Sequence, residues 1–299
     1  MPSAGAEGDI FWWGELQPDQ RPVDAYSLVY DTEPLSQDTA MIGLPHVMLH
    51  AAAGAPQANW FARLEDVAPD GRVTLVTGAA LNGAQRDSMA DPKKLVPGKT
   101  YALSFDLHLA AYVFPKGHRI RLAVSNALWP VAWPTPYAMD TTLDLGGGQA
   151  SWIDLPRVPL AGPAPPPSLL SAPTRVESRA DIVAGNSAWP GSQTVLRNEN
   201  GHTQVVWQGA TDTHYPWGQF HHTEKLTYDI DDAHPADAVD VGDSVYVQAV
   251  GTHTLTWHGH LSIRSDVGYF YYEYMRTLMR DGKVVISRTW REKIPRDHQ

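Results

Sequence analysis

The chain has 299 residues, of which 43% are hydrophobic and 19% are charged, and its formal net charge is −10. These values are typical of a globular protein, and the acidic balance argues against a nucleic-acid partner, because phosphate binding needs clustered Lys and Arg. The chain has no cysteine, which excludes disulfides, thiolate metal sites and a cysteine nucleophile.

The sequence predicts neither export nor insertion into a membrane. The first residues lack a basic segment followed by an apolar run, and no apolar stretch of about 18 residues occurs in the chain. We therefore expect a cytoplasmic protein with no membrane partner. This expectation carries no weight if the chain is a fragment of a longer protein.

The first half of the chain predicts an antiparallel β-sandwich. Strand-like segments are separated by tight-turn sequences at residues 68–71 and 96–99. Tyr101, Leu103 and Phe105 should share one face of their strand, because successive side chains point to opposite faces. The predicted strands lie at residues 46–51, 59–67, 72–79, 100–109 and 118–125.

A proline-rich segment at residues 161–173 predicts a linker between two β domains, at residues 1–160 and 174–299. In the second domain, residues 268–279 fit either a helix or a strand, and their aromatic content favours a strand. The other predicted strands of this domain lie at residues 202–209, 224–230, 243–251, 253–263 and 283–290. The fold class is therefore all-β, a sandwich followed by a second antiparallel β domain.

Two tryptophans follow the predicted strand at residues 118–125. Trp129 and Trp133 are each held in extended geometry by the proline that comes next. Such rings could stack on a ligand, cap the core or contact another domain. Together with Asn126 and Tyr137, they form our candidate substrate-binding or interface site.

No catalytic motif is recognisable in the sequence. An α/β-hydrolase needs its serine in a G-x-S-x-G turn between a strand and a helix. The nearest sequence, Gly185–Trp189 around Ser187, lacks the second glycine. Glycine motifs for phosphates or dinucleotides are also absent, and Gly146–Gly148 is interpreted as a loop. We therefore assign no catalytic residue and no cofactor.

His258 and His260 have a spacing that zinc sites use, because they share one face of a strand. No third ligand follows from the spacing. The other face of this strand carries apolar side chains, which are Leu255, Trp257, Leu261 and Ile263. We therefore expect the two histidines on a polar, solvated face, without a metal.

Aspartates near turns offer a second candidate metal site. Asp66 and Asp70 flank one turn, and Asp229, Asp231 and Asp232 cluster at another. Sandwich loops bind calcium through such carboxylates. Asp in turns is nevertheless commoner for its backbone hydrogen bonds, so we assign no calcium.

Several segments resemble a known family of hydrolases. The matching sequences are WFARLEDVAPDGRVTLVTGAALNGAQRD at residues 60–87 and LVPGKTYALSFDLHLAAYVFPKGHRIRLAVSNALWPVAWPTP at residues 95–136. They are similar to the C-terminal domain of X-prolyl dipeptidyl-peptidases and CocE/NonD serine hydrolases. The segment at residues 27–50 resembles the entry to that domain, and the ending RTWREKIPRDH at residues 288–298 resembles the end of long members.

The resemblance implies a galactose-binding-like jelly-roll sandwich that follows an α/β-hydrolase domain with a Ser-Asp-His triad. In such proteins the triad precedes the sandwich, so no residue of this chain is carried over as catalytic. We expect a non-catalytic portion of an ester or amide hydrolase. Its partner would be an α/β-hydrolase domain or subunit, in cis or in trans, and a homo-oligomer is a further expectation. The alternative is a free-standing carbohydrate-binding or interaction module.

Overall fold

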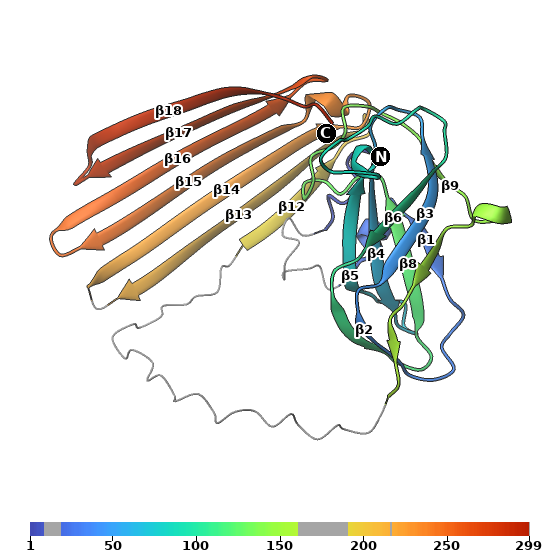
Figure 1. The fold of residues 1–299 in the computed structure, drawn as a ribbon. Coiled ribbons are helices and arrows are strands. Elements are labelled where there is room, and N and C mark those ends of the chain that lie inside the picture. The colour runs from blue at the N-terminus through green and yellow to red at the C-terminus, as the bar shows by residue number, and fades with distance from the viewer. Residues whose placement is uncertain (9–18, 161–190, 216, 299) are drawn as a thin grey trace.

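The computed structural model describes residues 1–8, 19–160, 191–215 and 217–298. Strands dominate this part of the chain, in two bodies that meet at one end (Figure 1). The helical elements are α1 (Arg21–Asp24) and the 3₁₀ turns η1 (Gly83–Gln85), η2 (Gly147–Gln149) and η3 (Pro235–Asp237). Among the described residues, no helix is long and apolar enough to cross a membrane.

The first body, which we call the sandwich, contains three antiparallel sheets. Their strand orders are β1-β8-β4-β5, β10-β3-β6 with β9 also on β3, and β11-β2-β7. The strands are β1 (Leu28–Asp31), β2 (Thr39–Gly43), β3 (His46–Ala53), β4 (Asn59–Val67), β5 (Val73–Asn82), β6 (Tyr101–Asp106), β7 (Ala110–Phe114), β8 (Arg119–Ser125), β9 (Thr141–Leu143), β10 (Trp152–Asp154) and β11 (Arg157–Val158). The predicted strands of this half are thereby confirmed.

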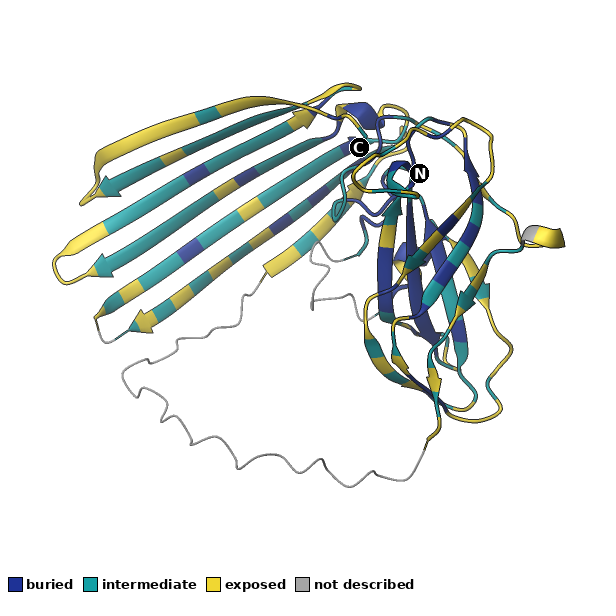
Figure 2. Ribbon diagram, in the orientation of Figure 1, coloured by how far each residue is buried: buried dark blue, intermediate teal, exposed yellow. Residues whose placement is uncertain are grey.

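The sandwich has one main hydrophobic core, formed by alternate residues of facing strands. Leu103 is fully buried there, and Tyr101 and Phe105 pack against it, as their spacing predicts. The turns before β5 and β6 use Gly71 and Gly98 at positive φ, a conformation that favours glycine. Dark blue, the colour of buried residues, is therefore concentrated in this body (Figure 2).

The second body is one antiparallel sheet of consecutive strands, β12 to β18, which we call the C-terminal sheet. Residues 269–280 form β17, so the prediction of a strand rather than a helix at residues 268–279 is confirmed. The predicted linker at residues 161–173 lies outside the described residues. The strands are β12 (Gly191–Arg197), β13 (His202–Tyr215), β14 (Gly218–Asp231), β15 (Val239–Val250), β16 (His253–Ser265), β17 (Tyr269–Arg280) and β18 (Lys283–Pro295).

The two faces of the C-terminal sheet differ in chemistry. The strand register places apolar and aromatic side chains side by side on one face, which we call the aromatic face. The opposite, polar face carries His258 and His260, as predicted, and His260 Nδ1 lies 2.7 Å from Asp243 Oδ1. The aromatic face contains Val205, Trp207, Phe220, Leu226, Tyr228, Tyr246, Leu255, Trp257, Leu261, Ile263, Tyr272, Tyr274, Leu278, Ile286 and Trp290.

Most side chains of the aromatic face are only half-buried (Figure 2). Trp257 and Leu261 are on the predicted side of β16, yet they line no enclosed core. Among the described residues, the sandwich covers this face at one end, and the strands project away from it (Figure 1). A sheet ordinarily buries its apolar face against a second layer, so this body departs from the usual layered domain.

Candidate functional site: the junction around Trp129 and Trp133

Trp129 lies in the loop after β8 and faces the C-terminal sheet. Only 1% of its surface is exposed, and it packs with Ala6, Val205 and Ile230. Its ring meets the ring of Tyr228 edge to face, with centroids 6.0 Å apart. In this structure Trp129 is therefore enclosed between the two bodies and offers no open ring to a ligand in solution.

Trp133 extends the same contact to two more strands. Its ring lies edge to face with Trp129 at 5.5 Å and with Phe270 of β17 at 5.6 Å. Its Nε1 donates a hydrogen bond of 2.9 Å to Ser265 Oγ at the end of β16. Edge-to-face geometry is the favourable arrangement for aromatic pairs, so the tryptophans bind the loop firmly to the sheet.

The residues that follow β18 return to this loop. Arg296 is 3% exposed, and its guanidinium donates to the carbonyl oxygens of Pro134 at 2.5 Å and Asp266 at 3.0 Å. Burial lowers the pKa of Arg296 to about 10. The next residues reach the sandwich, because Gln57 Nε2 donates to the Asp297 carbonyl at 3.1 Å. We call residues 296–298 the C-terminal clasp.

The N-terminal segment, residues 1–8, completes the junction. The backbone N–H of Trp129 donates to the carbonyl of Ala4 at 2.8 Å. On the other side, Gln193 Nε2 of β12 donates to the carbonyl of Ala6 at 3.1 Å. Arg197 pairs with Glu7 at 2.5 Å. The segment therefore lies between the tryptophan loop and the first strands of the C-terminal sheet.

The four predicted site residues do not form one platform. Trp129 and Trp133 form the centre of the junction, and Tyr137 lies in the same loop, between Trp133 and β9. Asn126 instead lines a separate cavity of about 300 Å³ with Tyr26 and Asp140. Ser265, Phe270 and Arg296 were not predicted as partners of the tryptophan loop, although Arg296 lies in the family-like ending.

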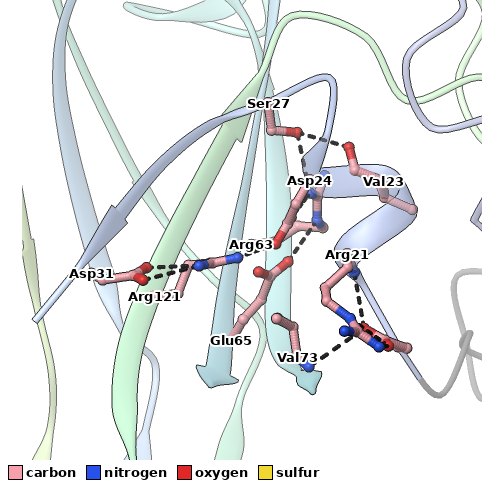
Figure 3. Close-up of polar contacts among 10 residues, drawn as sticks. Arg21, Val23, Asp24, Ser27, Asp31, Arg63, Glu65, Val73 and Arg121 are labelled. Carbon is pink, nitrogen blue, oxygen red and sulfur yellow. Dashed lines mark hydrogen bonds and ion pairs between the residues drawn. The ribbon is translucent and has the colours of Figure 1, made fainter. Parts of the chain in front are cut away.

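A buried ion cluster joins α1 to the sandwich beside the junction (Figure 3). Arg63 pairs with Asp24 at 2.7 Å and with Glu65 at 3.0 Å, and Arg121 pairs with Asp24 at 2.8 Å and with Asp31 at 2.7 Å. Burial raises the pKa of Glu65 to about 8, so this carboxyl is protonated at neutral pH. Arg63 and Arg121 then lie opposite the carboxyl groups of Asp24 and Asp31.

Ser104, His46 and Asp106 have the hydrogen-bond order of a catalytic triad. Ser104 Oγ lies 3.1 Å from His46 Nε2, and His46 Nδ1 lies 2.6 Å from Asp106 Oδ1. The three side chains stand on an open sheet surface, and Ser104 is inside β6 rather than on a turn. An acyl-transfer site also needs donors for the oxyanion, and a serine within a strand ladder does not have the exposed turn that provides them.

The candidate metal ligands have other partners. Asp66 accepts hydrogen bonds from Tyr112 at 2.8 Å and lies 2.9 Å from His118 Nδ1. Asp231 accepts from the backbone N–H of Ala233 at 2.8 Å. Across the described ranges, no three His, Cys, Asp or Glu side chains gather in a way that could hold a metal ion. Ser187 lies outside these ranges.

Residues 4–156, just over half of the chain, match the family described as the X-Pro dipeptidyl-peptidase C-terminal non-catalytic domain. The chain belongs to this family. The matched residues include the whole sandwich up to β10 and the tryptophan loop. The C-terminal sheet begins after the matched part of this non-catalytic domain.

Relatives of known name are hydrolases. A Mycobacterium bovis protein named as a serine esterase is 31% identical over 162 residues, and the match covers 46% of this chain and 25% of that protein. Cocaine esterase from a Rhodococcus species is 30% identical over 124 residues, with coverage of 40% and 22%. The structure of an α-amino acid ester hydrolase shares 28% identity over 47% of this chain and 27% of its own, with a TM-score of 0.45. The chain thus spans about a quarter of the length of these relatives.

Proposed function

We propose that this chain is the non-catalytic β portion of a serine hydrolase that acts on ester or amide bonds. The family match of residues 4–156 carries the proposal, because the family is described as non-catalytic and belongs to a peptidase. The names of the relatives, which include a cocaine esterase, favour ester bonds as the first substrates to test. The catalytic groups would come from an α/β-hydrolase domain, in cis or in trans.

The sandwich would pack on that hydrolase domain and help to shape its substrate cleft. Two features of the described residues support a non-catalytic role. The triad-like set around Ser104 lies on an open strand surface, and the Ser3 hydroxyl at the junction bonds to Asp232 and Arg197 rather than to a histidine. The carbohydrate-binding alternative has less support, because the ring of Trp129 is enclosed rather than presented to solvent.

The test is to assay the purified chain on p-nitrophenyl esters and on X-Pro p-nitroanilides, alone and with the α/β-hydrolase polypeptide. That polypeptide is the one encoded beside this chain, or in the same longer reading frame, with a G-x-S-x-G sequence. We expect no turnover by the chain alone. Adding the chain to the hydrolase polypeptide should raise its kcat/KM, because the sandwich completes the cleft.

Two variants separate the alternatives. Turnover by the chain alone that disappears in Ser104→Ala would show that the surface triad is catalytic and would overturn the proposal. Loss in Ser187→Ala would locate a nucleophile in the segment around Gly185–Trp189. Turnover that survives both substitutions comes from a contaminating enzyme. A hydrolase polypeptide whose kinetics do not respond to the chain would also contradict the proposed role.

A further inference from the structure

We propose that the aromatic face of the C-terminal sheet is the surface on which the catalytic portion of the hydrolase docks. The inference rests on the proposed function and goes beyond it, because this sheet begins after the residues that match the family. It assigns the docking to one face of one sheet, and thus to named residues.

The two faces differ in how many of their side chains already have interaction partners within the chain. On the polar face, the charged groups pair with one another, as in Arg291 with Glu273 at 2.8 Å and His221 with Asp212 at 2.7 Å. On the aromatic face, rings stack along the sheet, and Tyr274 and Trp290 lie 5.7 Å apart. The rings of this face, which also carries Arg276 and Arg288, gain free energy when a partner removes them from water.

The aromatic face continues an interface that the chain already makes. At the end near the sandwich, Val205 and Tyr228 pack against Trp129, and Phe270 packs against Trp133. Farther along the same strands, Tyr246, Trp257 and Leu278 follow in register. These residues lie on the same face of the sheet as the residues that contact the sandwich. Their side chains therefore point toward the side of the sheet that the sandwich occupies. A partner that contacts both the sandwich and the aromatic face would form an interface continuous with the existing junction.

Two carboxyl groups on the aromatic face are partly buried within the chain itself. Asp240 lies on it, opposite Tyr228 and Ile263, and burial raises the pKa of Asp240 to about 6. Burial also raises the pKa of Glu224 farther along the sheet. Both carboxyls are therefore partly desolvated before any partner binds, so covering the face costs less in lost hydration.

The size of the face fits a folded domain rather than a small ligand. Strands of 12 to 14 residues cross most of the sheet. At ~3.3 Å per residue and ~4.8 Å between strands, the face measures about 40 by 29 Å. Subtracting roughly a third for the end that the sandwich covers leaves on the order of 750 Å², which is close to one partner's share of a standard interface.

The identity of the occupant follows from the family of the sandwich. The relatives are about four times as long as the part that this chain matches, and the family is the non-catalytic part of its parent enzymes. The catalytic portion of such an enzyme is therefore the occupant that the family match favours. A second copy of this chain is the competing occupant, and the experiment distinguishes the two.

The variant replaces three aligned residues of the aromatic face by a polar strand former, as Tyr246→Thr, Trp257→Thr and Leu278→Thr. Threonine keeps the preference for strands while removing the apolar contact. Binding to the α/β-hydrolase polypeptide is measured by calorimetry or interferometry. We expect the Kd to rise by about 100-fold or more, because buried aromatic residues dominate interface energetics.

The matched control changes the polar face of the same strands, as Val245→Thr, His258→Thr and Met279→Thr. These residues alternate with the first three along β15, β16 and β17. The control should leave the Kd within about 3-fold of the parent value, since surface changes away from an interface have small effects. Equal weakening in both variants, or in neither, would overturn the docking assignment while leaving the proposed function intact.

Two other outcomes would contradict either the proposed function or the choice of occupant. If the parent chain does not bind the hydrolase polypeptide at all, the proposed function fails and the docking assignment fails with it. If the parent chain is a dimer in analytical ultracentrifugation and the aromatic-face variant is a monomer, the occupant is a second copy.

Hydroxyl-radical labelling of the parent chain tests the assignment without any variant, in case the triple substitution prevents folding. The complex with the hydrolase polypeptide should protect Trp257 and Trp290 on the aromatic face. Met275, on the polar face of β17, should be labelled equally in the free chain and in the complex. Protection of Met275 without the tryptophans would overturn the assignment.

Discussion

Single polar side chains hold the junction where water has little access. Arg296 is the clearest case, because its guanidinium joins two backbone carbonyls from different bodies and lies 4.8 Å from the ring centre of Phe270. Its sequence context, a short basic and proline-containing ending, gave no indication of burial. Hydrogen bonds from a charged donor are stronger than neutral ones, so we expect much of the junction's stability to depend on this residue.

Arg296→Met should lower the free energy of unfolding by about 2–4 kcal/mol, because the carbonyls of Pro134 and Asp266 would be left buried without a donor. Urea titration followed by tryptophan fluorescence measures the loss. Arg291→Met is the control. Its side chain is 70% exposed and pairs with Glu273 at the surface, so the expected change is within about 0.5 kcal/mol. Equal losses would show that the clasp is not held by Arg296.

Glu65 gives the molecule a pH dependence of defined sign. Its pKa is about 8 in the folded chain and near 4.5 when unfolded, so the folded state keeps a proton that the unfolded state releases between these values. The stability that Glu65 contributes is therefore fully present below pH 4.5 and is lost as the pH rises toward 8. Glu65→Gln should gain about 2 kcal/mol or more relative to the parent between pH 5 and pH 8.

Urea unfolding at pH 5, 7 and 9 measures this gain. Glu273→Gln is the control, because its pairing with Arg291 lowers the pKa of Glu273 and a gain with rising pH is not expected. A Glu65→Gln variant that follows the parent at every pH would show that the buried carboxyl is ionised throughout, with Arg63 as its counter-charge.

At the scale of strands, alternation in the sequence predicted the structure well. The period of two placed Leu103 in the core and separated His258 from Trp257 on opposite faces. The same pattern cannot reveal what covers an apolar face, because alternation specifies the side and not the neighbour. For this reason the strands of the C-terminal sheet were predicted, whereas its open aromatic face was not.

Strand β18 is the outer edge of the C-terminal sheet among the described strands. Val284, Val285 and Ile286 expose 57% or more of their surface there, and the register with β17 shifts beside them. Exposed edges of this type pair with other chains, and charged side chains reduce that tendency. Lys283 and Arg288 flank the apolar triplet and already act in this way.

Val285→Lys should therefore slow aggregation of the isolated chain while changing the free energy of unfolding by no more than about 0.5 kcal/mol. Light scattering during incubation at elevated protein concentration measures the first effect, and urea titration measures the second. Val96→Lys, at a similarly exposed valine in the loop before β6, is the control and should aggregate like the parent. Equal improvement in both variants would attribute the effect to net charge instead of the edge.

On the scale of the whole molecule, the two bodies differ in the extent of the hydrophobic core that each contains. The sandwich contains a continuous core, whereas fully buried residues of the C-terminal sheet, such as Val205 and Ile230, gather near the junction. That junction could not be predicted from sequence, because its partners are far apart in the chain: Pro134 and Arg296 are separated by 162 residues. The tryptophan loop and the C-terminal ending are separate motifs in the sequence, and only the folded structure shows that they are in contact.

The isolated chain should unfold in two steps, with the C-terminal sheet melting at lower urea than the sandwich. Hydrogen exchange should show the same order, with amides of β15 and β16 far from the junction exchanging before those of β4. Adding the hydrolase polypeptide should raise the urea concentration at the midpoint of the first transition and leave that of the second transition nearly unchanged. A single transition that coincides by fluorescence and circular dichroism would contradict this division.

The C-terminal clasp contacts residues far away in the sequence, and this separation sets the order in which the parts of the chain fold. Strands of the C-terminal sheet pair with their immediate neighbours in the chain, so each hairpin can form as soon as it is synthesised. The contact between Gln57 and Asp297 instead closes a loop of 240 residues, and long-range closure is slow. The nascent chain therefore displays the sandwich with its tryptophan loop uncovered until β13 and β14 supply Val205 and Tyr228, which pack on Trp129. Trp133 waits longer, until Phe270 of β17 is made, and Arg296 then closes the contact by bonding to Pro134.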